Sequence, residues 1–164
     1  MARKNNFRRI FRKVGIKMKV DIVRMDHQGR GIGYINNKVV FVPNTLIDEV
    51  VEIEITKEKK NYLEGKVVKF LKKSTKRRKS KCPYYLECGG CQLLHMSYED
   101  SLNYKLDKIK SILKQNNVDY ENINIIKNEK NYNYRNKIEL KIVDGKVGYF
   151  KGESHTLAEI AQCI

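Results

Sequence analysis

One stretch of the sequence alternates strictly between apolar and polar side chains: Val51-Glu52-Ile53-Glu54-Ile55-Thr56. A period of two is typical of a β-strand with one buried face and one face in water. Four further segments on either side have strand character, at residues 18–22, 34–35, 39–42 and 62–70. Five short strands bury too little surface as two open sheets, so the pattern favours a β-rich N-terminal barrel of five strands, OB-like in type. A β-sandwich is the alternative that composition leaves open.

The positive charge of the chain is concentrated in two blocks. The 164 residues hold 34 Lys and Arg against 19 Asp and Glu, a formal net charge of +15. Residues 1–19 contain eight basic side chains and no acid, and residues 57–81 contain twelve basic side chains and two acids. Such blocks favour a polyanion partner, nucleic acid above all. The alternative for the densest run, residues 72–81, is a solvated linker that only aids solubility.

The sequence gives no sign of a membrane protein. No stretch approaches the roughly 20 apolar residues of a membrane span, and the basic first 20 residues lack the apolar core of a secretory signal. We therefore expect no membrane partner and a cytoplasmic location, where thiols stay reduced. The sequence also shows no catalytic triad, no paired carboxylates and no phosphate-binding glycine loop.

Four cysteines follow the spacing C-x5-C-x2-C-x71-C, with Cys82, Cys88 and Cys91 in one loop and Cys163 far along the chain. In a reducing compartment this spacing favours metal or redox chemistry over disulfides. A single Cys-x2-Cys pair favours iron–sulfur over zinc, and a set of free thiols is the third alternative. Gly89 and Gly90 predict a turn with positive φ that brings backbone N–H groups close to sulfur.

A helix is predicted over residues 97–116, between this loop and a second β-rich region. Ser97 and Asp100 form a capping pair at its start. Its apolar stripe indicates core or interface packing and consists of Tyr98, Leu102, Leu106, Ile109 and Leu113. Residues 123–126 and 138–143 have strand character, and Asp144-Gly145 predicts a type I′ turn into a strand over 146–150. Local hydrogen bonding is expected for His95 and His155, and a surface position for His27.

Several motifs resemble one known family. They are Cys82-Pro83, then Cys88-Gly89-Gly90-Cys91-Gln92-Leu93-Leu94-His95, the Tyr98…Lys105 helix, Tyr134-Arg135-Asn136-Lys137, Val147-Gly148-Tyr149-Phe150 with Ser154-His155, and Cys163. Together with the N-terminal barrel, they resemble the iron–sulfur class of S-adenosylmethionine-dependent RNA uracil-C5 methyltransferases that begin with a TRAM domain. The resemblance covers about residues 15–164.

The resemblance implies a basic arm at 1–14, an RNA-binding TRAM barrel at 15–73 and a partial α+β iron–sulfur domain at 74–164. It implies that Cys82, Cys88, Cys91 and Cys163 ligate a 4Fe-4S cluster that orders the RNA-binding domain and takes no part in methyl transfer. A TRAM domain with a cluster is most similar to members that modify ribosomal RNA, here 23S rRNA. The basic side chains expected to contact RNA are Arg8, Arg9, Arg12, Lys13, Lys72, Lys73, Lys76, Arg77, Arg78, Lys79, Arg135 and Lys137.

Aromatic side chains expected to stack on unpaired bases are Tyr34, Tyr84, Tyr85 and Phe41. Each contributes about 1–3 kcal/mol to binding where it is used in this way. Packing in the core or in a turn is the alternative for all four, and it is favoured for Phe41.

The sequence departs from the family after Cys163, where family enzymes continue into the domain that binds S-adenosylmethionine and carries the nucleophilic cysteine. We therefore expect an N-terminal portion that binds RNA and a cluster but does not methylate alone. The alternative is a stand-alone basic RNA-binding TRAM protein with structural zinc or no metal. Helix 97–116 packs on the catalytic domain in the family. Its stripe is therefore expected to be partly exposed here, open to self-association or to a separate catalytic chain.

Overall fold

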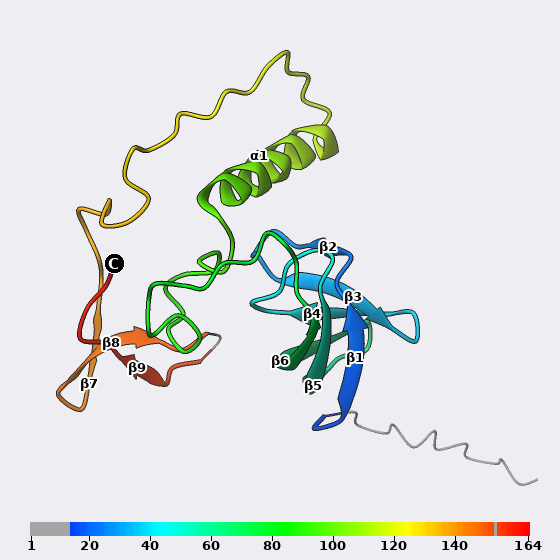
Figure 1. Ribbon diagram of the computed structural model, residues 1–164, viewed down its shortest axis with the longest axis horizontal. Coiled ribbons are helices and arrows are strands. Elements are labelled where there is room, and N and C mark those ends of the chain that lie inside the picture. Colours follow the sequence, from blue (N-terminus) through cyan, green and yellow to red (C-terminus); the bar gives the residue numbers. More distant parts are fainter. Residues whose placement is uncertain (1–13, 153) are drawn as a thin grey trace, which may run out of the picture.

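The computed structural model describes residues 14–152 and 154–164 (Figure 1). Its N-terminal part is a six-stranded sheet made of β1 (Lys17–Asp21), β2 (Arg24–Met25), β3 (Gly31–Ile35), β4 (Lys38–Val42), β5 (Val50–Glu58) and β6 (Tyr62–Lys72). The strand order is β1-β5-β6-β4-β3-β2, and every pair is antiparallel except β4 with β6, which is parallel. The prediction of five strands is corrected to six, because β2 has only two residues and shows no periodicity.

The sheet curls on itself so that β1 lies against β3 (Figure 1). Gly33 permits this approach, since a Cβ atom at this position would lie 2.6 Å from the carbonyl oxygen of Asp21. Asn36 and Asn37, both at positive φ, form the tight turn between β3 and β4. The result is a small barrel-like sheet.

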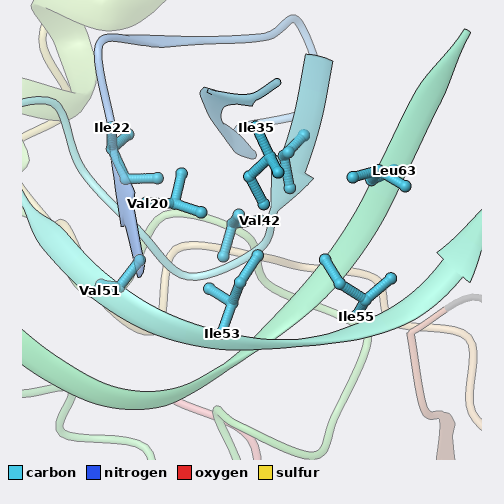
Figure 2. Close-up of a cluster of buried hydrophobic side chains, with 9 residues drawn as sticks. Val20, Ile22, Ile35, Val42, Val51, Ile53, Ile55 and Leu63 are labelled. Carbon is cyan, nitrogen blue, oxygen red and sulfur yellow. The ribbon is translucent and has the colours of Figure 1, made fainter. Parts of the chain in front are cut away.

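Nine apolar side chains fill the interior of this barrel, and Figure 2 shows them pointing toward one another. They are Val20, Ile22, Ile35, Val40, Val42, Val51, Ile53, Ile55 and Leu63. The alternation of β5 is confirmed, because Val51, Ile53 and Ile55 are fully buried while Glu52 and Glu54 are only partly covered. Full burial of each such side chain stabilises the fold by about 1.5–3 kcal/mol.

Helix α1 (Tyr98–Gln115) confirms the predicted helix, with Ser97 as its N-cap and Asn116 as its C-cap. The Ser97 hydroxyl oxygen accepts a hydrogen bond from the backbone N–H of Asp100 at 3.0 Å. The helix is tied to the loop after β2. There the Tyr104 hydroxyl donates to the carbonyl of Asp26, and Lys108 Nζ donates to the carbonyl of His27 at 2.8 Å.

The apolar stripe of α1 is covered unevenly. Leu102 is buried, which differs from the expected partial exposure of the whole stripe. Leu106 and Leu113 are half-buried, and Ile109 and Ile112 are 47% and 41% exposed. α1 is the single helix among the described residues, and no helix there is both long and apolar enough to cross a membrane.

A second sheet lies near the end of the chain, in the order β7 (Lys141–Val143), β8 (Lys146–Phe150) and β9 (Leu157–Glu159), with both pairs antiparallel. The turn at Asp144-Gly145 is confirmed, with φ of 50° and 74°. The strand expected over 123–126 is wrong, because this apolar segment has no neighbouring strand to pair with and its Ile126 is 98% exposed. The strand expected over 138–143 is shortened to β7 for the same reason.

Candidate functional site

All four cysteines line one cavity with a volume of about 70 Å³. Cys82, Cys88 and Cys91 come from the loop before α1, and Cys163 arrives from the end of the chain. All four are free thiols. The cavity therefore gathers thiols that are distant in sequence.

The second sheet brings the chain end to the cysteine loop. The backbone N–H of Gly89 donates to the carbonyl of Phe150 at the end of β8 at 3.0 Å, and Cys88 forms an isolated β-bridge with Lys151. Beyond β9, the backbone N–H of Ala161 donates to the Tyr84 hydroxyl oxygen at 3.3 Å. These contacts hold residues 160–164 beside the loop.

The two glycines of the loop act differently from the prediction. Neither Gly89 nor Gly90 is among the residues with positive φ. Gly89 is required for space instead, because a Cβ atom there would lie 2.6 Å from the Phe150 carbonyl oxygen. The expected N–H donor to sulfur is present, since Gly90 N–H donates to Cys88 Sγ at 3.4 Å.

The surroundings of Cys91 disfavour its thiolate form. Burial raises the pKa of the Cys91 thiol, and Cys163, Cys88 and Cys82 raise it further, while Arg135 opposes them. A metal that binds them as thiolates supplies the missing positive charge.

Four thiol donors around one cavity suit iron–sulfur chemistry. No group of three or more His, Cys, Asp or Glu side chains in residues 14–152 and 154–164 is arranged so that it could hold a metal ion. A tetrahedral zinc site, with Zn–S bonds of about 2.3 Å, requires such a compact set. The four cysteines thus supply thiol donors around one cavity without being arranged about a single point.

Arg135 lies at this cavity together with Tyr132, Tyr134 and Tyr149. A hydrogen bond with Tyr134 raises the pKa of the Arg135 guanidinium. Arg135 was expected to contact RNA, and the structure places it beside the cysteines. Lys137 is exposed and pairs with Glu139 at 3.2 Å.

A buried ion pair joins the basic run to the barrel. The carboxylate of Glu49 is fully buried and receives hydrogen bonds from Arg77 Nε and Nη2, the latter at 2.7 Å. The backbone N–H groups of Leu46 and Ser74 donate to the same carboxylate at 2.9 and 3.2 Å. Burial alone would raise the pKa of Glu49, but these hydrogen bonds outweigh it and hold the pKa below its usual value.

Arg77 was expected to contact RNA, and the structure places its guanidinium in this ion pair. Its Nη2 also donates to the carbonyl of Asn44 at 2.7 Å, and its guanidinium lies 4.3 Å from the centre of the Phe70 ring. Most of the side chain is covered by the fold, with 16% of its surface exposed. No sequence pattern distinguishes it from its basic neighbours, and Glu49 gave no signal because its partner is 28 positions away.

A second buried polar pair lies next to this one. The Tyr85 hydroxyl donates to the carbonyl of Gln92 at 2.8 Å and lies against His95 Nδ1, while His95 Nε2 is 3.4 Å from the carbonyl oxygen of Thr45. Burial, reinforced by Arg77, lowers the pKa of His95 to about 4. Local hydrogen bonding of His95 is confirmed. The expected stacking role of Tyr85 is wrong, because its side chain is buried.

The remaining aromatic candidates differ in their exposure. Tyr34 is 48% exposed on the barrel surface. Phe41 is half-buried, packs edge-on against Tyr62 and is covered by the guanidinium of Arg30 at 4.4 Å, which agrees with the packing role favoured for it. Tyr84 lines the cysteine cavity.

A groove of about 910 Å³ lies between β6 and the segment 73–86. Lys73, Arg78 and Lys79 line it, together with Lys66, which the sequence analysis did not single out. Other predicted contacts lie elsewhere. Lys72 is exposed at the end of β6, and Lys76 Nζ is 3.8 Å from Asp100. The candidates Arg8, Arg9, Arg12 and Lys13 lie outside the described residues.

Comparison with known proteins identifies one matching domain family and several proteins of similar sequence. Residues 12–68 match the TRAM domain. The chain is 38% identical to an "uncharacterized RNA methyltransferase" of Clostridium tetani, over 87% of this chain and 32% of that protein. It is 36% identical to a protein of the same description from Aquifex aeolicus, over 90% and 35%. It is 33% identical to the 23S rRNA (uracil(1939)-C(5))-methyltransferase RlmD of Aliivibrio salmonicida, over 89% and 35%.

The chain spans about a third of the length of these curated relatives. Among solved structures, a conserved protein of Methanococcus maripaludis is 28% identical and has a TM-score of 0.36, with 42% of this chain and 100% of that chain covered.

Proposed function

We propose that this chain, which carries a TRAM domain and is a relative of RNA methyltransferases, is the RNA-binding part of an S-adenosylmethionine-dependent RNA uracil-C5 methyltransferase and holds a 4Fe-4S cluster. The observation that carries the proposal is the convergence of all four cysteines on one cavity. The barrel and the basic run supply the positive surface for RNA. The proposed substrate is a uridine of 23S rRNA, the RNA in the name of the Aliivibrio relative.

Cys82, Cys88, Cys91 and Cys163 would hold the cluster as thiolates. A bound cluster supplies bonds to iron that tie the loop before α1 to the end of the chain. The Gly90 N–H donates to the Cys88 sulfur and offsets part of the thiolate charge. This assigns the cluster a structural role, in which it orders the RNA-binding surface.

Methyl transfer is assigned to the part of the relatives that this chain does not span. All four cysteines of the chain line the cavity, so none is left to act as a nucleophile on uracil. The exposed Ile109 and Ile112 of α1 are the proposed contact for the rest of the enzyme, for a separate catalytic chain or for a second copy.

The test is metal analysis of the chain purified without oxygen. About four iron and four sulfide per chain are expected, with both lost in Cys163→Ser and both retained in the control Thr156→Ser on the same segment. Stoichiometric zinc, or no metal, would instead favour a TRAM-type RNA binder without a cluster.

The proposal also predicts no methylation by the purified 164-residue chain with S-adenosylmethionine and ribosomal RNA. Turnover in that assay would contradict the assignment of all four cysteines to the metal site.

A further inference from the structure

The groove between β6 and the segment 73–86 is strongly cationic. Five basic residues line it, and no Asp or Glu among the described residues does. They are Lys66, Lys73, Arg77, Arg78 and Lys79. The charges of two of them are neutralised by carboxylates that do not line the groove. Arg77 pairs with Glu49, and Lys66 Nζ lies 3.2 Å from Glu54. Lys73, Arg78 and Lys79 thus give the groove its excess charge.

The cationic wall is held in place by the fold. Arg78 N–H donates to the carbonyl of His95 at 2.8 Å, and Arg77 forms an isolated β-bridge with Met96. Arg78 Nη1 is further held by the carbonyl oxygens of Thr75 and Arg77, both at 3.0 Å. A wall fixed in this way loses less entropy on binding than a free linker. This separates it from a solvated run that only aids solubility.

Apolar surface lies beside the cations. Val68 on β6 is 42% exposed and Leu86 on the opposite wall is 77% exposed, and Pro43 and Pro83 also line the groove. Unpaired nucleobases present apolar faces to such surfaces, whereas a duplex stacks those faces inside. The volume of about 910 Å³ is also in the range of about 300–1,000 Å³ of pockets that enclose small ligands, which suits a few unpaired nucleotides.

We propose that an unpaired segment of RNA lies in this groove, with its phosphates on Lys73, Arg78 and Lys79 and its bases against Val68 and Leu86. The inference rests on the proposed RNA-binding function and adds to it the form of the RNA and its path across the chain. Charge complementarity and the exposed apolar wall favour this occupant over an acidic peptide.

The test measures binding of a labelled unpaired RNA of about 12 nucleotides, and of a hairpin of equal length, by fluorescence anisotropy over a range of salt. The groove variant Lys73→Gln/Lys79→Gln is compared with Lys105→Gln/Lys114→Gln on α1, which removes equal charge. For the unpaired RNA we expect about a tenfold loss of affinity near 0.1 M salt in the groove variant. We also expect a salt slope shallower by about 1.4, or about 0.7 per phosphate contact. The control should stay within about twofold of wild type.

A third variant separates base contacts from phosphate contacts. Leu86→Ser should weaken binding of the unpaired RNA by about three- to tenfold and leave the salt slope unchanged, because it removes apolar contact and no charge. All variants are compared at equal metal content and equal circular dichroism, so that a folding defect is recognised.

The outcomes distinguish the two proposals. Equal losses in the groove and control variants, tighter binding of the hairpin, or displacement of RNA by equimolar poly-glutamate would overturn the groove assignment and leave RNA binding in place. Absence of RNA binding by the wild-type chain would overturn both.

Discussion

Replacing Arg77 by methionine is expected to destabilise the fold strongly, although Arg77 lies in a run of otherwise exposed basic residues. The change removes two hydrogen bonds to the Glu49 carboxylate, one to the Asn44 carbonyl and the contact with Phe70. It leaves a fully buried carboxylate without its counter-charge. Breaking a buried ion pair from one side costs about 3–5 kcal/mol. The backbone donors Leu46 and Ser74 stay in place, so we expect a value near the lower end, about 3 kcal/mol.

The pH dependence follows from the lowered pKa of Glu49. In the wild type, the unfolded chain binds a proton at Glu49 at a higher pH than the folded chain does. The contribution of ionised Glu49 to the free energy of unfolding is therefore complete above the unfolded pKa, and it is lost as the pH falls through the folded pKa. In Arg77→Met the burial that raises the pKa is opposed by fewer hydrogen bonds, so Glu49 protonates more readily in the folded state. The stability gap between variant and wild type should therefore narrow from pH 7 toward pH 4.

Urea unfolding followed by circular dichroism at both pH values gives the difference in free energy of unfolding. The control is Arg78→Met one position along, on an exposed side chain, which should change stability by no more than about 0.5 kcal/mol. The loss of stability in Arg77→Lys should lie between those of Arg77→Met and Arg78→Met, since lysine keeps the charge but cannot form the paired hydrogen bonds of the guanidinium. Equal effects at positions 77 and 78, or a loss that stays the same at both pH values, would refute the buried-pair explanation.

Three other expectations follow from single contacts. Ser97→Ala should cost about 1 kcal/mol in unfolding experiments because it removes the helix N-cap, whereas the exposed Ser111→Ala within α1 should cost nothing measurable. Gly89→Ala should reduce the iron retained per chain, because its methyl group would lie 2.6 Å from a backbone carbonyl oxygen. Gly152→Ala, with open space around it, should retain iron like wild type. With the pKa of His95 lowered to about 4, stability should fall as the pH drops from about 6.5 to about 4, since the unfolded chain binds that proton first. His95→Gln should show a shallower fall in the same range, and an equally steep one would assign the loss to other groups.

The elements that the sequence predicted are those whose signals are local. The alternation of β5, the cap at Ser97 and the turn at Asp144-Gly145 are each encoded within a few consecutive residues, and all three are confirmed. The two-residue β2 and the missing strand over 123–126 depend on whether a partner strand lies alongside. Strand character in one segment gives no information about that partner.

In the candidate site, too, the sequence predicted the local features and missed those that depend on the tertiary structure. The spacing of the cysteines indicated a shared site, yet left iron and zinc open. The gathering of Cys163 with the loop depends on β8 and β9, of which only β8 was foreseen. Arg135 was assigned to RNA by resemblance to a motif, and its position beside the cysteines required the tertiary structure.

The basic run shows why charge alone gives an incomplete account of function. Arg77 and Lys79 are two positions apart, carry the same charge and both line the groove, but Arg77 is paired with Glu49 and holds the run against the barrel, while Lys79 is exposed. Because Arg77 holds the backbone of the run against the barrel, Lys79 would lose less entropy on binding the proposed phosphate than a lysine on a free linker. Cys82 and Tyr85 line both the groove and the cysteine cavity. A metal group bound by the cysteines, as proposed above, would therefore also shape one wall of the groove.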